Sequence, residues 1–285
     1  EVTMINLEKD FQDIVIKYGE EKGLIFSDCD RKQAVIRVLN FYRKIGVGNK
    51  KVISYARNIE IPKKFQKRVE SVLKYLSKGG DITPYLSTQS IKLDSQQDLM
   101  FNDWNILHIH LGKKPHINNP RFIERTGELL FLLYTVNEIR VLGLYHHNPP
   151  SWSKQKLLQT IYDNWPEMLS VFPEAQLEVN FNDHQKGELR KSHVNVIDEV
   201  YDKKEQKKFC VMTTATMGIT CSGESSIDVM RYNKICRFLR EIEKSIRKEN
   251  LLTAAKLYES NGVWVVVDNN LQKFYWSGKL VNLIR

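Results

Sequence analysis

The sequence predicts an α+β protein with a basic helical N-terminal module, a central small antiparallel sheet with helices, and a C-terminal α+β domain. Three observations support this class. Apolar residues recur at helical spacing over the first 80 residues, alternate with period two after Trp104, and show both patterns beyond Glu174. We therefore expect three domains, at residues 1–80, 81–173 and 174–285.

The composition is that of an ordinary folded protein. Of its 285 residues, 42% are hydrophobic and 27% are charged, so the chain can bury a sizeable core. The sequence contains no run of about 18 uncharged apolar residues, and its start lacks the basic and apolar regions of a secretory signal. The four cysteines form no CxxC pair, which favours reduced, buried thiols. We expect a cytoplasmic protein that does not bind a membrane.

Positive charge is concentrated in the predicted N-terminal module. Residues 31 to 78 contain 14 lysines and arginines but only two acidic residues, so this segment alone carries a net charge of +12. Helices are expected over residues 4–22, from an Asp28 or Asp30 cap to about Ile45, near 50–58, and from Pro62 to about Leu76. Exposed cations at this density are typical of a surface that neutralises phosphates. The alternatives are a basic surface that is merely solvated and one that docks an acidic protein.

The candidate nucleic-acid-binding residues are the lysines and arginines on the exposed faces of these helices, together with two lysines of a later loop. They are Arg37, Arg43, Lys44, Lys50, Lys51, Arg57, Lys63, Lys64, Lys67, Arg68, Lys113 and Lys114.

The central domain is expected to follow a polar linker over residues 79–102. From Trp104 the pattern alternates, which predicts a strand with His108 and His110 on one face. The sequence KKPHINNPR then predicts a basic loop. Residues 129–136 are nearly all apolar, as in a strand buried on both faces, and a turn at Asn137 leads into a second strand that ends at His146 and His147.

The C-terminal part mixes helices and strands. A helix is expected after Ser151 or Ser153, with strands near 177–182, 194–200 and 209–213. A long helix should run from Ser226 or Asp228 to about Lys248, and a hairpin with a turn at Asn269-Asn270 should close the chain.

Five of the seven histidines lie between Trp104 and His147, which makes this stretch the candidate active site. Cleavage of RNA without a metal needs a base for the ribose 2′-hydroxyl, an acid for the leaving oxygen and a cation near the phosphorane. The candidate catalytic residues are His108, His110, Arg125, His146 and His147. No cofactor is required. The alternatives are a metal site built on the same histidines, and histidines that serve only as hydrogen-bonded strand residues.

Two weaker candidate sites lie in the C-terminal half. One is a nucleophile, Cys221 or Ser222, with His184 or His193 as its base. The other is a loosely spaced nuclease-like set of carboxylates and a lysine, comprising Glu178, Asp183, Glu188 and Lys191.

Three consecutive segments carry a resemblance to a known family. KRVESVLKYLSKG predicts a helix, HIHLG a strand that ends in a Leu-Gly turn, and FIERTGELLFLLYTVNEIRVLGLYHH an arginine-bearing hairpin that ends in an aromatic-His pair. Residues 67–148 thereby resemble the bacterial RelE/YoeB-type mRNA interferase toxins.

The resemblance implies a small twisted antiparallel sheet backed by helices, and mRNA cleavage without a metal, often in the ribosomal A site. It implies that Arg125 stabilises the phosphate, and that His146 and His147 occupy the place where the family ends in His-Tyr. Where the family usually has a second arginine, this sequence has Glu128 and Leu129.

The leading hypothesis is therefore a metal-independent endoribonuclease of a toxin-antitoxin or phage-defence kind. It would act on RNA in preference to DNA, and an antitoxin-like protein inhibitor is a possible partner. A non-enzymatic DNA-binding or RNA-binding regulatory protein and a metal-dependent nuclease are the alternatives.

Overall fold

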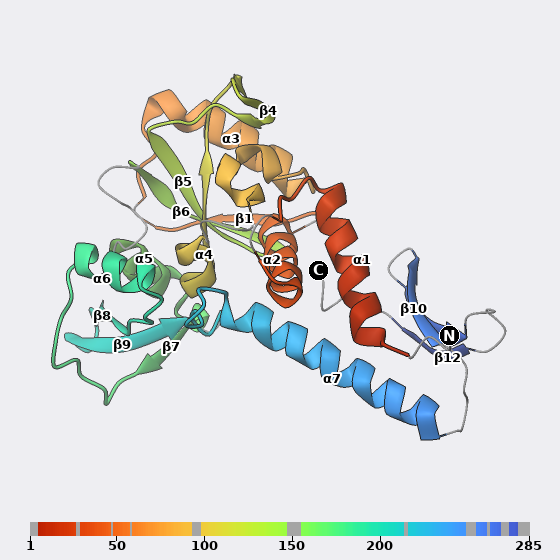
Figure 1. Ribbon diagram of the computed structural model, residues 1–285. Coiled ribbons are helices and arrows are strands. Elements are labelled where there is room, and N and C mark those ends of the chain that lie inside the picture. Colours follow the sequence, from red (N-terminus) through yellow and green to blue (C-terminus); the bar gives the residue numbers. More distant parts are fainter. Residues whose placement is uncertain are drawn as a thin grey trace. The chain divides into compact units, whose positions relative to one another are not determined.

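The computed structural model describes residues 5–26, 29–46, 48–57, 59–92, 98–146, 155–213, 216–248, 255–260, 263–268 and 274–278. These residues form an α+β fold with small sheets, as predicted (Figure 1). The chain divides into two compact units, which differ from the predicted domains. Unit 1 comprises residues 1–43, 91–95 and 228–285, and unit 2 comprises residues 44–90 and 96–227. Both predicted domain boundaries fall inside unit 2.

Unit 1 contains α1 (Leu7–Glu21), most of α2 (Arg31–Ile45) and most of α7 (Ser226–Lys248). Its sheet is antiparallel, with β10 (Ala255–Ser260), β11 (Val263–Asp268) and β12 (Phe274–Gly278) in that order. The Asn6 side chain caps α1 by accepting the N–H of Lys9 at 2.9 Å. The Phe11 ring of α1 then packs 5.8 Å from that of Trp264 in β11. The three helices and the two strands of the closing hairpin are confirmed, and β10 was not predicted. The predicted turn at Asn269-Asn270 lies outside the described residues.

A four-stranded sheet organises unit 2. Its order is β1 (Val52–Tyr55), β6 (Glu138–His146), β5 (Glu128–Tyr134) and β2 (Ile106–His110). β1 runs parallel to β6, and the other pairs are antiparallel. The helix expected near residues 50–58 is wrong, because this segment is β1. Its sequence, Val-Ile-Ser-Tyr, suits a strand, and its hydrogen-bonding partner lies about 85 residues further along the chain.

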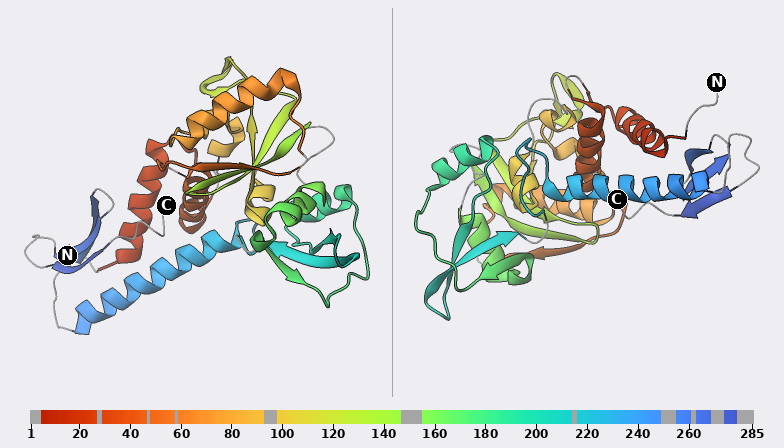
Figure 2. Two further views of the ribbon diagram at one scale, coloured as in Figure 1. Left: turned by 180° about the vertical axis from the view of Figure 1, so that it is seen from behind. Right: turned by 60° about the horizontal axis from the view of Figure 1, so that its bottom comes forward.

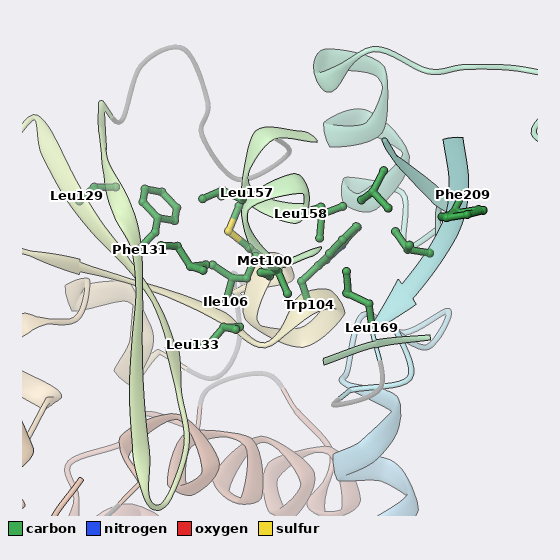
Figure 3. Packing of buried hydrophobic residues seen from close by; sticks show 14 residues of the cluster. Met100, Trp104, Ile106, Leu129, Phe131, Leu133, Leu157, Leu158, Leu169 and Phe209 are labelled. Atoms are coloured by element: carbon green, nitrogen blue, oxygen red, sulfur yellow. The ribbon is translucent and has the colours of Figure 1, made fainter. Parts of the chain in front are cut away.

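One face of this sheet, which we call the core face, packs against an apolar core of unit 2. The core also includes side chains of α4 (Leu99–Trp104), α5 (Gln155–Asn164) and a second, antiparallel sheet of β7 (Leu169–Phe172), β9 (Lys207–Thr213) and β8 (Asp198–Asp202). In Figure 3, Phe131 and Leu129 point from β5 toward Met100 and Leu157, with Trp104 between them and Phe209. The helix α4 replaces the end of the predicted linker.

The second sheet of unit 2 is flanked by helices. Both views of Figure 2 show α5 and α6 (Asp183–Lys191) beside its strands. The strand expected near 177–182 is wrong. Residues 177–182 form no regular element, and Asn182 caps α6 in a capping box with Gln185. A short 3-10 helix, Pro166–Met168, connects α5 to β7.

The opposite face of the four-stranded sheet, which we call the helix face, is covered by α3 (Lys63–Ser77). This helix begins after Pro62, as predicted, and buries Val69, Val72, Leu73 and Leu76. The 3-10 helices Thr83–Tyr85 and Thr88–Ile91 follow it. The predicted basic loop contains a small hairpin, β3 (Pro115–His116) and β4 (Asn119–Ile123), which lies next to α3 in Figure 1. Among the described residues, no helix is long and apolar enough to cross a membrane.

Candidate functional site

A β-bulge in the β5–β6 hairpin decides which side chains meet at its open end. Near the turn, Tyr134 pairs with Ile139 and Leu132 with Val141, but Phe131 pairs with Gly143. Leu142 is therefore an extra residue. Beyond the bulge Glu128 pairs with His146, whereas an unbroken register would pair it with Tyr145. Because a shift of one residue moves every side chain to the other face, the bulge places His146 beside Glu128.

Three charged or titratable side chains meet on the helix face at this end of the hairpin. The Glu128 carboxylate oxygen Oε1 lies 3.2 Å from Lys64 Nζ, on α3, and 3.9 Å from His146 Nε2. The Lys64 and His146 side chains are each 70% exposed, and Glu128 is 20% exposed. We call these three residues the Glu128 cluster. It combines a carboxylate, an imidazole and an ammonium group within reach of solvent.

The Glu128 cluster has the residue types that acid–base chemistry on a phosphate requires. A carboxylate can accept a proton, an imidazolium can donate one, and an ammonium group can stabilise negative charge on a phosphate oxygen. The exposed side chains of Lys64 and His146 can be reached by a substrate from solvent. The distance of 3.9 Å between Glu128 Oε1 and His146 Nε2 is compatible with catalysis, because catalytic hydrogen bonds are often longer before a substrate is bound.

The other two described candidate histidines lie on the opposite side of the sheet. His108 pairs with Phe131 and His110 with Leu129, so both project from the core face, as predicted for a shared face. The His108 ring packs 5.8 Å from that of Phe131. His110 is only 4% exposed, and its Nδ1 accepts the N–H of Thr126 at 3.3 Å. His108 and His110 therefore lie on the face of the sheet opposite to His146, because the bulge turns His146 to the helix face.

The remaining candidate catalytic residues do not join the Glu128 cluster. Arg125 is exposed and donates from Nη2 to the hydroxyls of Ser87 and Thr88, at 3.4 and 3.3 Å. His147 lies outside the described residues. Within the described ranges, no three His, Cys, Asp or Glu side chains are grouped so that they could hold a metal ion.

Unit 2 carries a set of exposed lysines at the start of α3 and just after β2. The Arg68 guanidinium of α3 donates to the carbonyl of Leu111, at 3.1 Å, and to that of Gly112, which ties α3 to the turn after β2. Glu124 holds the next residues by accepting the N–H groups of Lys113 and Lys114. These bonds fix the backbone of both lysines next to Gly112, which Arg68 contacts. We call this set the basic surface; its members are Lys63, Lys64, Lys67, Lys113 and Lys114.

Several predicted nucleic-acid-binding residues are instead part of the fold. Lys44 and Lys51 are each 5% exposed. Lys44 pairs with Asp98 at 3.6 Å, and Lys51 donates to the carbonyls of Gly46 and Val136. Buried lysines with these partners cannot contact a phosphate backbone, so these two predictions are wrong.

The other predicted cations are divided between the two units. In unit 1, Arg43 is paired with the buried Asp228 at 3.0 Å, and Arg37 is half-buried. In unit 2, Lys50 and Arg57 are exposed, and Arg57 lines a pocket beside β6 and α5. The basic segment 31–78 therefore does not form one continuous helical module.

A buried charge network supports the core face of unit 2. Arg190 of α6 bonds to Asp103 of α4 at 2.6 Å and to Asp198 of β8 at 3.3 Å, and Lys186 also pairs with Asp198. Burial raises the pKa of both carboxyls, against the opposing effect of these cations. All four side chains are nearly fully buried. The network joins three elements around the core and offers no open position to a substrate.

The two weaker candidate sites are not assembled for catalysis. His193 Nδ1 lies 3.0 Å from the carbonyl oxygen of Cys221, so the imidazole holds the backbone of this turn. In the carboxylate-lysine set, Lys191 pairs with Glu188 on one exposed turn of α6, as neighbours three residues apart commonly do.

Glu128 was not among the predicted catalytic residues, although one feature of the sequence points to its position. Gly143 lies inside an apolar strand pattern, and a glycine there often marks a bulge. Counting the register through such a bulge would have paired Glu128 with His146.

Comparison with protein-family models, with curated proteins and with solved structures finds no match to this chain. The resemblance of residues 67–148 to the RelE/YoeB-type toxins thus stays a prediction.

Proposed function

We propose that unit 2 binds RNA along the basic surface and cleaves it at the Glu128 cluster without a metal ion. The observation that carries this proposal is the meeting of Lys64, Glu128 and His146 at one exposed end of the β5–β6 hairpin. His146 was among the predicted catalytic residues, whereas His108 and His110 are reassigned to the fold. Arg125 is not needed for the reaction.

The proposed reaction is an internal transesterification. Glu128 accepts the proton of the ribose 2′-hydroxyl, and the resulting oxygen attacks phosphorus. The bond from phosphorus to the 5′-oxygen breaks, and His146 in its protonated form donates a proton to that leaving oxygen. Lys64 stabilises the negative charge on the phosphorane. The products are a 2′,3′-cyclic phosphate and a 5′-hydroxyl, so the reaction needs ribose and is specific for RNA.

Binding to the phosphate backbone is supported by the neighbouring lysines. Those at positions 63, 67, 113 and 114 are exposed, and they lie on elements that Arg68 and Glu124 hold together. An antitoxin-like inhibitor, if one exists, would act by covering this surface.

A second candidate function is RNA or DNA binding without cleavage. It is favoured by the contact between Lys64 and Glu128, because an exposed lysine-glutamate pair is also common on surfaces that have no catalytic role. In that case the basic surface would be the whole functional site.

The test is to incubate the purified chain with end-labelled single-stranded RNA in EDTA and to measure binding at several salt concentrations. We expect cyclic-phosphate products, and an affinity that falls with salt by a log-log slope of about −0.7 for each phosphate neutralised. Lys67→Ala and Lys113→Ala should each make this slope shallower. Lys191→Ala, which changes an exposed lysine of α6, is the matched control.

The outcomes separate the candidates. Salt-dependent binding without products would contradict the nuclease and support the binding protein. Cleavage that appears only when a divalent metal is added would contradict the metal-free reaction. Equal slopes for all three lysine variants would contradict the basic surface.

A further inference from the structure

A pocket of about 720 Å³ opens in unit 2 beside the second half of β6. It forms where β1 separates from β6. Their last register pair is Tyr55 with Val141, and the N–H of Ala56 still donates to the Val141 carbonyl at 3.0 Å. Beyond this point, the segment from Gly143 to Tyr145 lines the pocket, and Arg57, Lys203 and residues of α5 complete it. A volume of this size suits a small organic ligand.

Hydrogen bonds hold the walls of the pocket in place. The Asn164 side chain accepts the N–H of Arg57 at 2.7 Å and donates to the Thr160 carbonyl at 2.8 Å, so it joins two walls. The Gln159 amide both donates to and accepts from the backbone of Tyr201, which fixes α5 to β8. A ligand would therefore meet a site that is already formed, with little ordering to be done on binding.

Tyr145 gives the pocket an aromatic side chain. It projects from the core face, because its register partner is Leu129. Its ring lies edge-on to Phe131, with centroids 5.6 Å apart, and its hydroxyl bonds to Thr160. Burial raises the pKa of Tyr145, so the phenol stays neutral at physiological pH. A ring held at its edge and at its hydroxyl has a fixed orientation, which favours contact with a planar ligand.

The charges around the pocket favour an anion. Asp163 pairs with Lys203 at 3.4 Å. Arg57 and Lys156 are exposed and make no ion pair with any described residue, and the Lys156 ammonium lies 5.6 Å from the centre of the Tyr145 ring. Against these two cations stands one further carboxylate, Glu60. A phosphate would pair with Arg57 and Lys156 beside the aromatic ring.

We infer that this pocket binds a nucleotide, with its base against Tyr145 and its phosphate on Arg57 and Lys156. The site is separate from the proposed cleavage site, since Tyr145 and His146 project from opposite faces of β6. The nucleotide could be a free one or a unit of single-stranded RNA, because both present a base and a phosphate. The inference does not require that the chain cleaves RNA.

The test is isothermal titration calorimetry of the intact chain with AMP, UMP, adenosine and inorganic phosphate. We expect the two nucleotides to bind more tightly than adenosine or phosphate. Arg57→Ala and Lys156→Ala should each weaken nucleotide binding about tenfold, because each removes a charged partner of the phosphate. Tyr145→Leu should weaken it by about tenfold through the loss of stacking. Lys191→Ala is the control, and circular dichroism checks that each variant is folded.

Competition between AMP and a short single-stranded RNA then identifies the source of the nucleotide. Displacement indicates an RNA unit, and binding of AMP without displacement indicates a free nucleotide. The inference is overturned if neither AMP nor UMP binds, or if Arg57→Ala and Lys156→Ala bind both as the unaltered chain does. A chain that cleaves RNA but binds no mononucleotide would refute the pocket alone. A chain that binds mononucleotides but never cleaves RNA would refute the nuclease alone.

Discussion

The two faces of the four-stranded sheet hold histidines in contrasting surroundings. On the core face, His108 packs against Phe131, and the almost fully buried His110 accepts a backbone N–H from Thr126. On the helix face, His146 is 70% exposed and lies 3.9 Å from a carboxylate oxygen. Burial and a fixed hydrogen bond make a histidine part of the fold. Exposure beside a carboxylate leaves a histidine able to exchange protons with a substrate.

The largest expected effect on stability comes from a change in the buried charge network beside the core face. Arg190→Ala would leave Asp103 without its buried cation and would leave Asp198 with Lys186 alone. We expect the free energy of unfolding to fall by about 3–5 kcal/mol, the usual result of removing one partner from a buried pair. Urea denaturation measures this loss.

The neighbouring exposed residue provides the control for that change. Lys191→Ala should alter the free energy of unfolding by about 0.5 kcal/mol or less. Equal effects of the two substitutions would show that the buried network does not support the core face.

The bulge sets which face of the sheet Tyr145 and His146 occupy. Its loss should therefore affect stability and cleavage together. Gly143 has φ +141°, and a Cβ there would lie 2.9 Å from Tyr145 Cε2. Gly143→Ala should cost about 1–3 kcal/mol and lower the cleavage rate, because the position of His146 depends on the bulge. Urea denaturation and the RNA assay measure the two effects.

Gly127→Ala is the matched control for the bulge, since an added Cβ there meets nothing within 4 Å. We expect it to behave as the unaltered chain in both measurements. A Gly143→Ala variant with unchanged stability and unchanged cleavage would contradict the role given to the bulge.

The smallest expected effect concerns Asp98, beside the core-face His108. Burial acts to raise the pKa of Asp98, but Lys44, His108 and the N–H of Phe101 outweigh it, so the pKa is lowered. The resulting stabilisation, on the order of 1 kcal/mol, is complete above the ordinary aspartate pKa of about 3.9. It is lost as the pH falls through the lower value of the folded state.

Asp98→Asn isolates this contribution, because asparagine can still cap α4. The difference in unfolding free energy between Asp98→Asn and the unaltered chain should shrink as the pH falls below about 4. A difference that grows in acid would mean that the sign of the pKa shift is wrong.

Local periodicity predicted much of the fold. Helical spacing located α1, α2, α3 and α7, alternation located β2 and β6, and a nearly continuous apolar run located β5. Two of the failures, at β1 and at the buried lysines, have a common cause, which is a partner far along the chain. β1 is a strand because β6 pairs with it. Lys44 is buried because it forms an ion pair with Asp98, and Lys51 is buried because it donates to the carbonyl of Val136. Spacing within a segment carries no information about such partners.

Only part of the candidate site could be predicted, because the rest also depends on pairing with a distant part of the chain. Alternation placed His108 and His110 on one face, which is confirmed, and His146 at the end of its strand, which is also confirmed. Which face His146 occupies depends on the single extra residue at Leu142, and only the observed register shows that. Charge density marked a basic segment correctly but could not divide it between two units.

The most direct test compares single-turnover RNA cleavage by Glu128→Gln, His146→Ala and His110→Ala in EDTA. We expect Glu128→Gln and His146→Ala to lower the rate by a factor of about 10²–10⁴ with unfolding free energy and RNA affinity retained. His110→Ala should lower the unfolding free energy by about 1–3 kcal/mol, with the rate per folded molecule unchanged. Unchanged rates for Glu128→Gln and His146→Ala, or an inactive but fully stable His110→Ala, would contradict the assignment of catalysis to the helix face.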